Sequence, residues 1–452
     1  MRTFTSPYSP KASARSPLRL DLVWRISLNL RNSAPSEPRQ EDCLMRNPFL
    51  HPNRIFSSGF YRDADLDFEV RTTLGGAASG AADTGEVLST IAEIDEGDSQ
   101  AWFDRWTALG ERVQTIAEES AARGHLVSAA GSYLRASTYF GVALGSIDRL
   151  DSDELLVPTF RQHREAWDRF VDATSAKTER VEIPYEGMTM PGYLFKPAGN
   201  GVKCCLILVN GSDGTLSGLW GCAKAALERG YTVLMFDGPG QQSLLFEKDV
   251  PFRFDWEAVI TPVVDFLLER PDVGSSRLAI YGVSQAGYWV PRALAFEHRI
   301  AAAVVDPGVV DVSTSWIEHL PSGLKKLLNE GNERRFDLEM SWGMKLSRET
   351  SRMWKFRARP YRQDSYFKTV QEVLKYNLID VAGGIRTSMF ITDPEDEQFW
   401  PGQAKWLADM LPGEKMLSTF TAAEGANFHC QPLARMLTEQ RMFDWLDDVL
   451  KR

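Results

Sequence analysis

The sequence predicts an α/β fold in which a mostly parallel central sheet is flanked by helices. Four short, continuous apolar runs have the pattern of buried strands: 204–209, 231–236, 277–280 and 301–305. Helical stretches at 219–228 and 256–268 alternate with these runs, and Gly-rich turns such as Asn210-Gly211-Ser212-Asp213-Gly214 follow them. This alternation is typical of a parallel sheet with helices on both faces.

A helical region is predicted ahead of the sheet. Between residues 83 and 174 apolar residues recur at three- and four-residue spacing, for example in 129–140, which places them on one face of a helix. We interpret this stripe as core and expect a helical N-terminal domain at 46–178. Residues 180–185 and 192–195 are predicted to form an antiparallel hairpin that leads into the sheet.

The first 45 residues differ from the rest of the chain in composition. They are rich in Ser, Pro and Arg and poor in acids, and their apolar segment 18–25 is broken by charge. We expect this stretch to be disordered or to be a wrongly assigned start, with Met45 as the true beginning. An organelle-targeting peptide is the alternative.

A second helical segment, 309–382, interrupts the order of the strands as an insertion would, so the sheet domain is expected in two parts, 179–308 and 383–452. The aromatic and methionine content of the insertion suits a lid over an apolar ligand. Core packing within the insertion explains the same residues. We expect substrate contacts from five aromatic residues: Trp289, Trp316, Trp342, Trp354 and Tyr361.

The run Gly282-Val283-Ser284-Gln285-Ala286-Gly287, directly after the strand at 277–280, says most about chemistry. A strand that ends in Gly-x-Ser-x-small-Gly and continues into a helix is how the α/β-hydrolase fold presents a serine on a sharp turn. Small residues at 282, 286 and 287 fit such a bend. The pattern alone is short and also fits an ordinary strand-to-helix turn, so its context decides.

That context supplies the partners of a serine nucleophile. An acidic loop follows the apolar run 388–392, and a strand at 415–420 is followed by Asn427-Phe428-His429. Serine, then acid, then histidine is the chain order of α/β hydrolases, so His429 is predicted as the general base. We predict Asp396 as the acid, and the alternatives are four other carboxylates: Asp393, Glu395, Glu397 and, more weakly, Asp306.

The predicted chemistry follows from the weak nucleophilicity of an alcohol. His429 must take the proton of Ser284 as the hydroxyl attacks an electrophilic carbon, and the acid fixes the imidazole tautomer. The oxyanion is expected to be held by the N–H of Gln285 and by amides of Gly211 and Ser212 in the loop after the first parallel strand. His429 then protonates the leaving group, and water releases the acyl-enzyme.

Three segments resemble one branch of the α/β hydrolases: 252–262, 281–292 and 424–431. They are similar to the dihydropseudooxynicotine hydrolase and FrsA-like branch, to which fungal polyketide-shortening hydrolases of pigment pathways are related, and the resemblance covers residue 47 to the C-terminus. It implies a serine triad, a helical N-terminal region that closes over the site, no cofactor and frequent dimerisation. It also implies hydrolysis of a carbon–carbon bond next to a ketone or of an ester-like bond. Two departures, Ala286 and Gln242 where glycine is common, leave the triad intact.

Composition agrees with a large enzyme. At 452 residues, 43% hydrophobic and 25% charged, the chain can bury a full α/β core and a further domain. The net charge of −10 argues against nucleic acid as principal partner, and no apolar run suggests a membrane. The five cysteines lack metal-ligand spacing and suggest a reducing compartment. We therefore expect a cytoplasmic protein that acts on a small molecule without a metal or cofactor, with a homodimer as an open possibility.

Taken together, these features predict a serine-dependent hydrolase. The expected reaction is cleavage of a ketone-activated carbon–carbon bond or an ester in a small, largely apolar or aromatic metabolite. An acyltransferase or thioesterase is one alternative, because water access decides which nucleophile receives the acyl group. A non-catalytic binding or regulatory protein is the other, and the intact serine, histidine and acidic loop argue against it.

Overall fold

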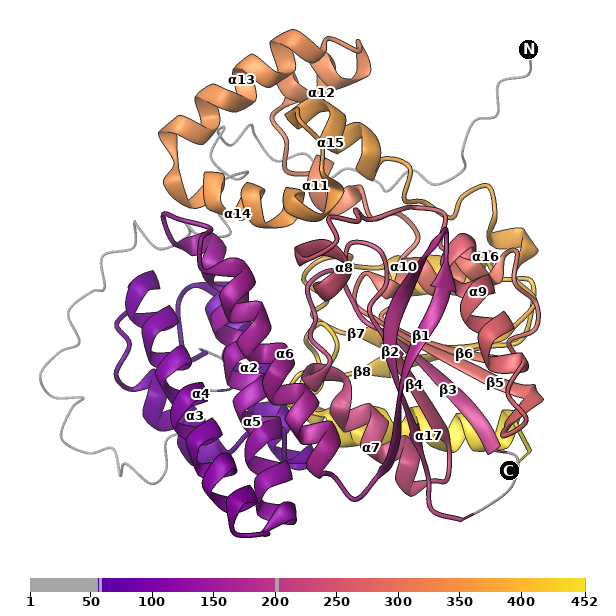
Figure 1. The fold of residues 1–452 in the computed structure, drawn as a ribbon. Coiled ribbons are helices and arrows are strands. Elements are labelled where there is room, and N and C mark those ends of the chain that lie inside the picture. The colour runs from indigo at the N-terminus through magenta and orange to yellow at the C-terminus, as the bar shows by residue number, and fades with distance from the viewer. Residues whose placement is uncertain (1–55, 57–58, 200–202, 452) are drawn as a thin grey trace, which may run out of the picture.

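The computed structural model describes residue 56, residues 59–199 and residues 203–451, so the predictions for residues 1–45 lie outside the described residues. Within these ranges the chain builds one eight-stranded sheet (Figure 1). Its strands in chain order are β1 (Lys177–Tyr185), β2 (Met188–Lys196), β3 (Lys203–Val209), β4 (Thr232–Phe236), β5 (Val273–Val283), β6 (Ala302–Asp306), β7 (Ser388–Pro394) and β8 (Lys415–Phe420).

The sheet is mixed, with the spatial order β1-β2-β4-β3-β5-β6-β7-β8. β1 pairs antiparallel with β2 and β2 antiparallel with β4, while the other neighbours are parallel. The predicted hairpin is confirmed, and Glu186 and Gly187 turn it with φ of 42° and 79°. Two successive positive φ values suit the right-handed twist of a two-residue hairpin.

The buried runs predicted from the sequence form the parallel strands because both faces of the sheet are covered. In β3, Ile207 and Val209 pack into the core on one face, whereas Leu206 and Leu208 pack into the core on the other. Side chains alternate with a period of two, so a strand that is buried on both faces must be apolar throughout.

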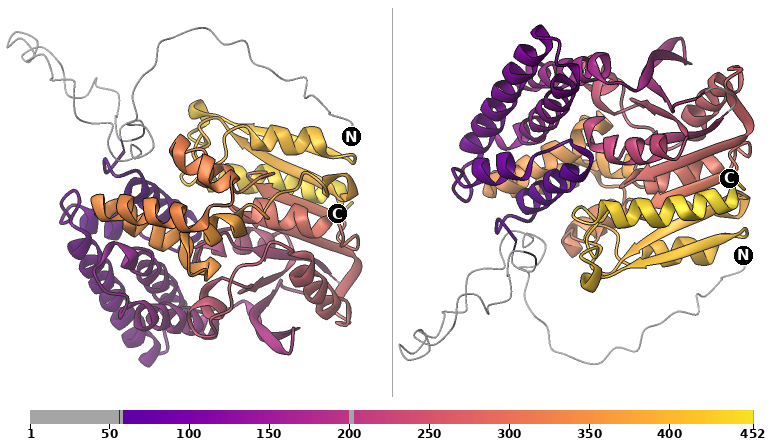
Figure 2. Two further views of the ribbon diagram at one scale, coloured as in Figure 1. Left: turned by 90° about the horizontal axis from the view of Figure 1, so that it is seen from above. Right: turned by 90° about the horizontal axis from the view of Figure 1, so that it is seen from below.

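Helices cover both faces of this sheet, as Figure 2 shows. α7 (Trp220–Glu228) and α17 (Arg435–Val449) pack on the face that holds Leu206 and Leu208. Three helices pack on the face that holds Ile207 and Val209: α9 (Glu257–Leu268), α10 (Ala286–Leu294) and α16 (Gln403–Met410). The short helix α8 (Gln242–Phe246) follows β4. The predicted α/β fold with flanking helices is confirmed.

Among the described residues, five α-helices precede the sheet: α2 (Ala64–Gly75), α3 (Thr84–Ile91), α4 (Ser99–Ala122), α5 (Leu126–Gly145) and α6 (Leu156–Ala173). They have an aromatic core of their own that includes Trp102, Trp106, Tyr139 and Phe140. Close packing of α4 on α5 depends on Gly110, where a Cβ atom would lie 2.7 Å from the ring of Phe140.

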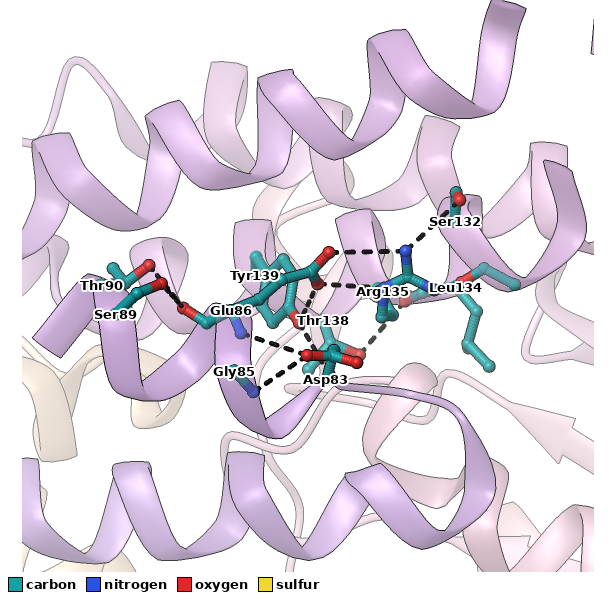
Figure 3. A network of polar contacts seen from close by, with 11 residues as sticks. Asp83, Gly85, Glu86, Ser89, Thr90, Ser132, Leu134, Arg135, Thr138 and Tyr139 are labelled. Carbon is teal, nitrogen blue, oxygen red and sulfur yellow. Dashed lines mark hydrogen bonds and ion pairs between the residues drawn. The ribbon is translucent and has the colours of Figure 1, made fainter. Parts of the chain in front are cut away.

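A partly buried polar network fastens α3 to α5 (Figure 3). Asp83 caps α3 by accepting from the N–H groups of Gly85 and Glu86. The hydroxyl of Tyr139 donates to Glu86 Oε2 at 2.6 Å and accepts from the N–H of Asp83 at 2.9 Å, while Arg135 pairs with Glu86 at 3.0 Å. Every partner is an α3 or α5 residue or its cap, which makes this network structural.

The segment between β6 and β7 is helical. It contains α11 (Thr314–Ile317), α12 (Ser322–Asn329), α13 (Glu333–Leu346), α14 (Arg348–Ala358), the 3-10 turn η5 (Arg359–Tyr361) and α15 (Tyr366–Val373). They project above the sheet as the orange helices of Figure 1 and have a small core around Phe336 and Met340. Arg359 of η5 pairs with Asp148, just after α5, at 2.5 Å, and both side chains are buried. The inserted helices are therefore fastened to the N-terminal helices.

Candidate active site

Ser284 lies at the turn between β5 and α10 with a φ of 56°, a left-handed conformation that is uncommon for residues other than glycine. Its N–H donates to the carbonyl of Asp306 at 2.7 Å, and its own carbonyl accepts from the N–H of Gly287 at 2.8 Å. These contacts on both sides hold the backbone in the strained conformation, which is the sharp turn that the sequence predicts.

The small residues around Ser284 are required by close backbone contacts. A Cβ atom on Gly282 would lie 2.6 Å from the carbonyl oxygen of Ala286, and one on Gly287 would lie 1.8 Å from that of Pro307. Ala286 is fully buried, so the methyl group at the position where glycine is common still fits.

His429 joins Ser284 to a carboxylate. Its Nε2 lies 2.9 Å from Ser284 Oγ, and its Nδ1 lies 2.9 Å from both oxygens of Glu397. Both side chains are almost fully buried, and the backbone N–H of His429 donates to Gln398 Oε1 at 2.8 Å. The structure therefore brings the predicted serine and histidine together in the order that proton transfer needs.

The acid is Glu397 in this geometry, and the prediction of Asp396 as the residue beside His429 is wrong. Asp396 is tied to a different neighbour: its carboxylate accepts from Asn427 Nδ2 at 2.6 Å, and its N–H donates to the Asn427 carbonyl at 2.8 Å. β7 extends to Pro394, beyond the strand expected at 388–392, so the loop starts later. Its third residue, with a longer side chain than aspartate, reaches the imidazole.

Electrostatics support a charged Glu397 beside the imidazole. Burial raises the pKa of Glu397. His429 and the N–H groups of Phe399 and Trp400 together lower it by more than burial raises it, so the pKa is below its usual value. Burial lowers the pKa of His429, while Cys430 and Glu397 raise it to well above its usual value. Burial raises the pKa of the Cys430 thiol above its usual value, although the charge of His429 lowers it.

Aromatic rings surround the imidazole. Ring centroids of Phe399, Trp400 and Phe68 lie 4.7, 5.8 and 6.1 Å from that of His429. Phe68 belongs to α2, so the N-terminal helices reach the site itself. Because apolar rings exclude water, the charge on Glu397 acts on His429 through a medium of low dielectric.

The loop after β3 approaches the serine from the other side. A Cβ atom on Gly211 would lie 2.8 Å from Ser284 Cβ, so the glycine allows this contact. The N–H of Gly211 donates to Asn210 Oδ1 at 3.1 Å and is thereby occupied, which leaves Ser212 as the predicted loop donor. Gln285 stands just before the first turn of α10, where N–H groups have no intrahelical acceptor.

Gln241 holds this loop in place, a role that sequence reasoning missed. Its Nε2 donates to the carbonyls of Asn210 and Gly211 at 2.8 and 3.0 Å, and its Oε1 accepts from the N–H of Gly238 at 2.9 Å. The side chain is buried, so all of its hydrogen-bonding capacity goes to fixing backbone next to Ser284.

Asp306, the weaker alternative for the acid, lies beneath the serine turn and not beside His429. Its fully buried carboxylate accepts from Arg435 at 2.9 Å and also from Tyr281, Thr392 and Gln431. Burial raises its pKa, but Arg435 and these donors lower it to below the usual value. The charge is structurally compensated, and the Asp306 carbonyl accepts the Ser284 N–H.

Two further carboxylates, Glu69 on α2 and Asp213 in the loop after β3, have raised pKa values. Burial raises the pKa of Glu69 on α2 to about 7, with a further contribution from the charge of Asp213. Burial likewise raises the pKa of Asp213, although the Ser212 hydroxyl and the positive field of His429 oppose this. The surroundings of the imidazole therefore carry acidic groups from both α2 and the loop after β3.

Four of the five aromatic residues predicted to contact substrate belong to one chain of ring contacts. Tyr361 packs against Trp316 at 5.5 Å, Trp316 packs against Trp354 at 5.3 Å, and Tyr361 packs against Phe252 at 5.3 Å. Trp289 contacts the other side of Phe252 at 5.0 Å.

The fifth residue, Trp342, lies apart from this chain, and the structure does not support its predicted role. It is 62% exposed on α13, and its ring contacts the ammonium group of Lys345. Trp289 is fully buried and stacks on Trp256 with centroids 4.5 Å apart, which also makes it a core residue.

Two findings apply to the part of the chain that the structure describes. No helix there combines the length and the apolar character that crossing a bilayer demands. In the same residues, no cluster of three or more His, Cys, Asp or Glu side chains is arranged to hold a metal ion.

The sheet order and the serine turn define the class: the chain has the α/β-hydrolase fold. Among its relatives is the hydrolase acrC of Aspergillus aculeatus, which is 29% identical over 422 residues that cover 86% of this chain and 97% of acrC. The 20-hydroxy-prefusarin hydrolase FUS2 of Gibberella moniliformis is 32% identical over 60% of this chain and 65% of its own length. No family model matches the chain.

A solved structure shares the fold over most of the chain. The 2,6-dihydroxy-pseudo-oxynicotine hydrolase superposes with a TM-score of 0.66 at 21% identity, covering 83% of this chain and 95% of its own. This likeness shows the fold, and the fungal relatives are named hydrolases, in agreement with the branch that the sequence motifs indicated.

Proposed function

We propose that the protein is a serine hydrolase that works through an acyl-enzyme, with Ser284 as nucleophile, His429 as general base and acid, and Glu397 as the carboxylate that orients the imidazole. The observation that carries this proposal is the position of His429, 2.9 Å from the Ser284 hydroxyl on one side and 2.9 Å from the Glu397 carboxylate on the other. Buried, hydrogen-bonded groups in this order are the arrangement that activates an alcohol.

Three side chains and two backbone N–H groups carry the proposed steps. His429 takes the hydroxyl proton as Ser284 attacks a carbonyl carbon, and Glu397 stabilises the imidazolium that forms. The N–H groups of Gln285 and Ser212 hold the oxyanion, each such donor contributing about 3 kcal/mol in comparable enzymes. His429 then delivers its proton to the leaving group, and a water molecule, deprotonated by the same ring, releases the acid.

The surroundings favour a neutral, largely apolar acyl compound. Phe68 and Phe399 beside the imidazole and the ring chain through Trp316 and Tyr361 offer apolar contacts. The family resemblance supports a carbon–carbon bond next to a ketone or an ester as the bond that is broken. In this proposal α2 and the inserted helices close over the site.

A substrate panel tests the proposal. Hydrolysis of β-diketones, aryl esters and thioesters is measured with the wild type, with Ser284→Ala and with Ser89→Ala, a matched control on α3 whose hydroxyl donates only to the carbonyl of Glu86. We expect turnover of at least one class, a loss of roughly 10⁶-fold in Ser284→Ala and none in Ser89→Ala. Equal turnover in Ser284→Ala would contradict the proposal.

The same panel with an added alcohol, amine or thiol separates hydrolysis from acyl transfer. Acid formed in the absence of any acceptor identifies water as the receiving nucleophile. Product that forms only when an acceptor is present would identify an acyltransferase instead.

A further inference from the structure

A buried phenol lies against the side chain of Gln285 at the serine turn. Tyr361, the last residue of η5, is 2% exposed, and no described residue gives its hydroxyl a hydrogen bond of good geometry. Buried hydroxyl groups are nearly always paired, so an unpaired one needs an explanation. The oxyanion donors and the Ser284–His429–Glu397 chain do not use it.

The neighbour of this hydroxyl is the residue that follows the nucleophile. Gln285 is 5% exposed, and its Nε2 likewise has no hydrogen bond of good geometry among the described residues. Burial raises the pKa of the phenol, and a weak hydrogen bond with the Gln285 side chain opposes this by lowering it. Two buried donors thus stand together, one from the inserted segment and one from the first turn after Ser284.

The phenol is held where it is. The N–H of Phe252 donates to the carbonyl of Pro360 at 2.8 Å, and Arg359 pairs with buried Asp148, so the residues just before Tyr361 are fixed to two parts of the fold. The ring itself is packed against Phe252, Trp316 and Tyr376 at centroid distances of 5.3, 5.5 and 5.5 Å. This packing keeps the hydroxyl beside Gln285 and away from solvent.

We propose that the Tyr361 hydroxyl and the Gln285 carboxamide form a second donor site, distinct from the backbone oxyanion donors, which binds an oxygen of the leaving group. This inference rests on the proposed function. The donor site matters most when the leaving group is an enolate. In that case the Ser284 alkoxide adds to one carbonyl of a 1,3-dicarbonyl compound, and the bond between that carbonyl carbon and the central carbon then breaks.

The atoms and electrons of this step balance within the site. The electron pair of the broken bond moves onto the second carbonyl and gives an enolate, whose oxygen accepts from Tyr361 and Gln285. The proton that His429 took from Ser284 passes to the central carbon and gives a neutral ketone. Water then releases the acyl group as an acid. Burial raises the pKa of Tyr361 well above its usual value, so the phenol stays protonated and remains a donor.

The test compares two substrates with the same acyl group, a 1,3-diketone and an alkyl ester. Removing the phenol oxygen in Tyr361→Phe is expected to lower kcat/KM for the diketone at least tenfold more than for the ester, and Gln285→Met is expected to act in the same direction. Tyr139→Phe, which removes a buried hydroxyl from the network of Figure 3, is the matched control and should leave the ratio unchanged.

A binding measurement keeps the inference testable where turnover is slow. In a Ser284→Ala background, the enol form of the diketone is followed by its ultraviolet absorbance, and adding Tyr361→Phe is expected to weaken its binding about tenfold or more. If Tyr361→Phe lowered kcat/KM equally for both substrates and left the binding of the enol unchanged, the proposal of a second donor site would be wrong. Full activity in Ser284→Ala would instead overturn the proposed function, so the two failures are distinguishable.

Discussion

Both carboxylate oxygens of Glu397 lie 2.9 Å from Nδ1 of His429. The same carboxylate accepts the N–H groups of Phe399 and Trp400, so its orientation is fixed from the backbone as well as from the ring. Asp396, one residue earlier, bonds to Asn427 instead. Two adjacent acids therefore have different tasks, one toward the imidazole and one toward the loop that carries it.

Exchange of each acid for its amide separates these tasks. Glu397→Gln removes the charge that stabilises the imidazolium and is expected to lower kcat by about 10³- to 10⁴-fold. Asp396→Asn keeps an oxygen that can accept from Asn427 and should cost less than about tenfold in kcat/KM. Steady-state kinetics on both purified variants tests the assignment of Glu397 as the acid. A larger loss of activity in Asp396→Asn than in Glu397→Gln would assign that role to Asp396 instead.

The pH dependence of kcat/KM reports the protonation of His429. The ring must be neutral to accept the serine proton, so activity rises with pH through its pKa, which lies above the usual value of 6.5. Removing the charge in Glu397→Gln favours the neutral ring and should move this acidic limb to lower pH. A limb that stays in place in the variant would show that Glu397 does not control the titration.

Gly211 tests the approach of the loop to the serine. In Gly211→Ala the new Cβ would lie 2.8 Å from Ser284 Cβ, so the loop and its oxyanion donor must move. We expect kcat to fall by about 10²-fold while the folded state survives. Gly145→Ala at the end of α5 meets nothing within 4 Å and is the control. Unchanged kcat in Gly211→Ala, measured on folded protein, would contradict the placement of this loop.

Substitution of Arg435 tests whether the buried Asp306 carboxylate beneath the serine turn depends on its cation. Arg435→Met leaves the fully buried Asp306 carboxylate without its cation and is expected to lower the free energy of unfolding by about 3 kcal/mol. Lys405→Met, which breaks an exposed pair with Asp409, should change it by less than about 1 kcal/mol. Urea unfolding followed by tryptophan fluorescence gives both values, and equal effects would mean that Asp306 is not dependent on Arg435.

Much of the fold could be predicted because the signals are local. The parallel strands are short apolar runs, and the serine turn needs small residues at Gly282 and Gly287, so both features can be read from neighbouring residues. The hairpin between β1 and β2 is likewise encoded by alternation and by a Glu186-Gly187 turn.

The acid could not be assigned in the same way. Four acidic or amide residues follow β7 within a few positions, and which of them meets His429 depends on where the strand ends and on the bond between Asp396 and Asn427, 31 positions apart. Gln241 and Phe68 were missed for a similar reason, since their contacts with the site come from distant elements. Trp342 shows the opposite failure, because an aromatic residue in an amphipathic helix can simply face solvent.

Labelling with a fluorophosphonate tests the central claim most directly, because the reagent reacts with a serine that a histidine activates and requires no knowledge of the substrate. Intact-mass measurement on the folded wild type should show one label per chain, peptide mapping should place it on Ser284, and Ser284→Ala should show none. Folded wild-type protein that takes up no label, or that carries the label on another residue, would contradict the account.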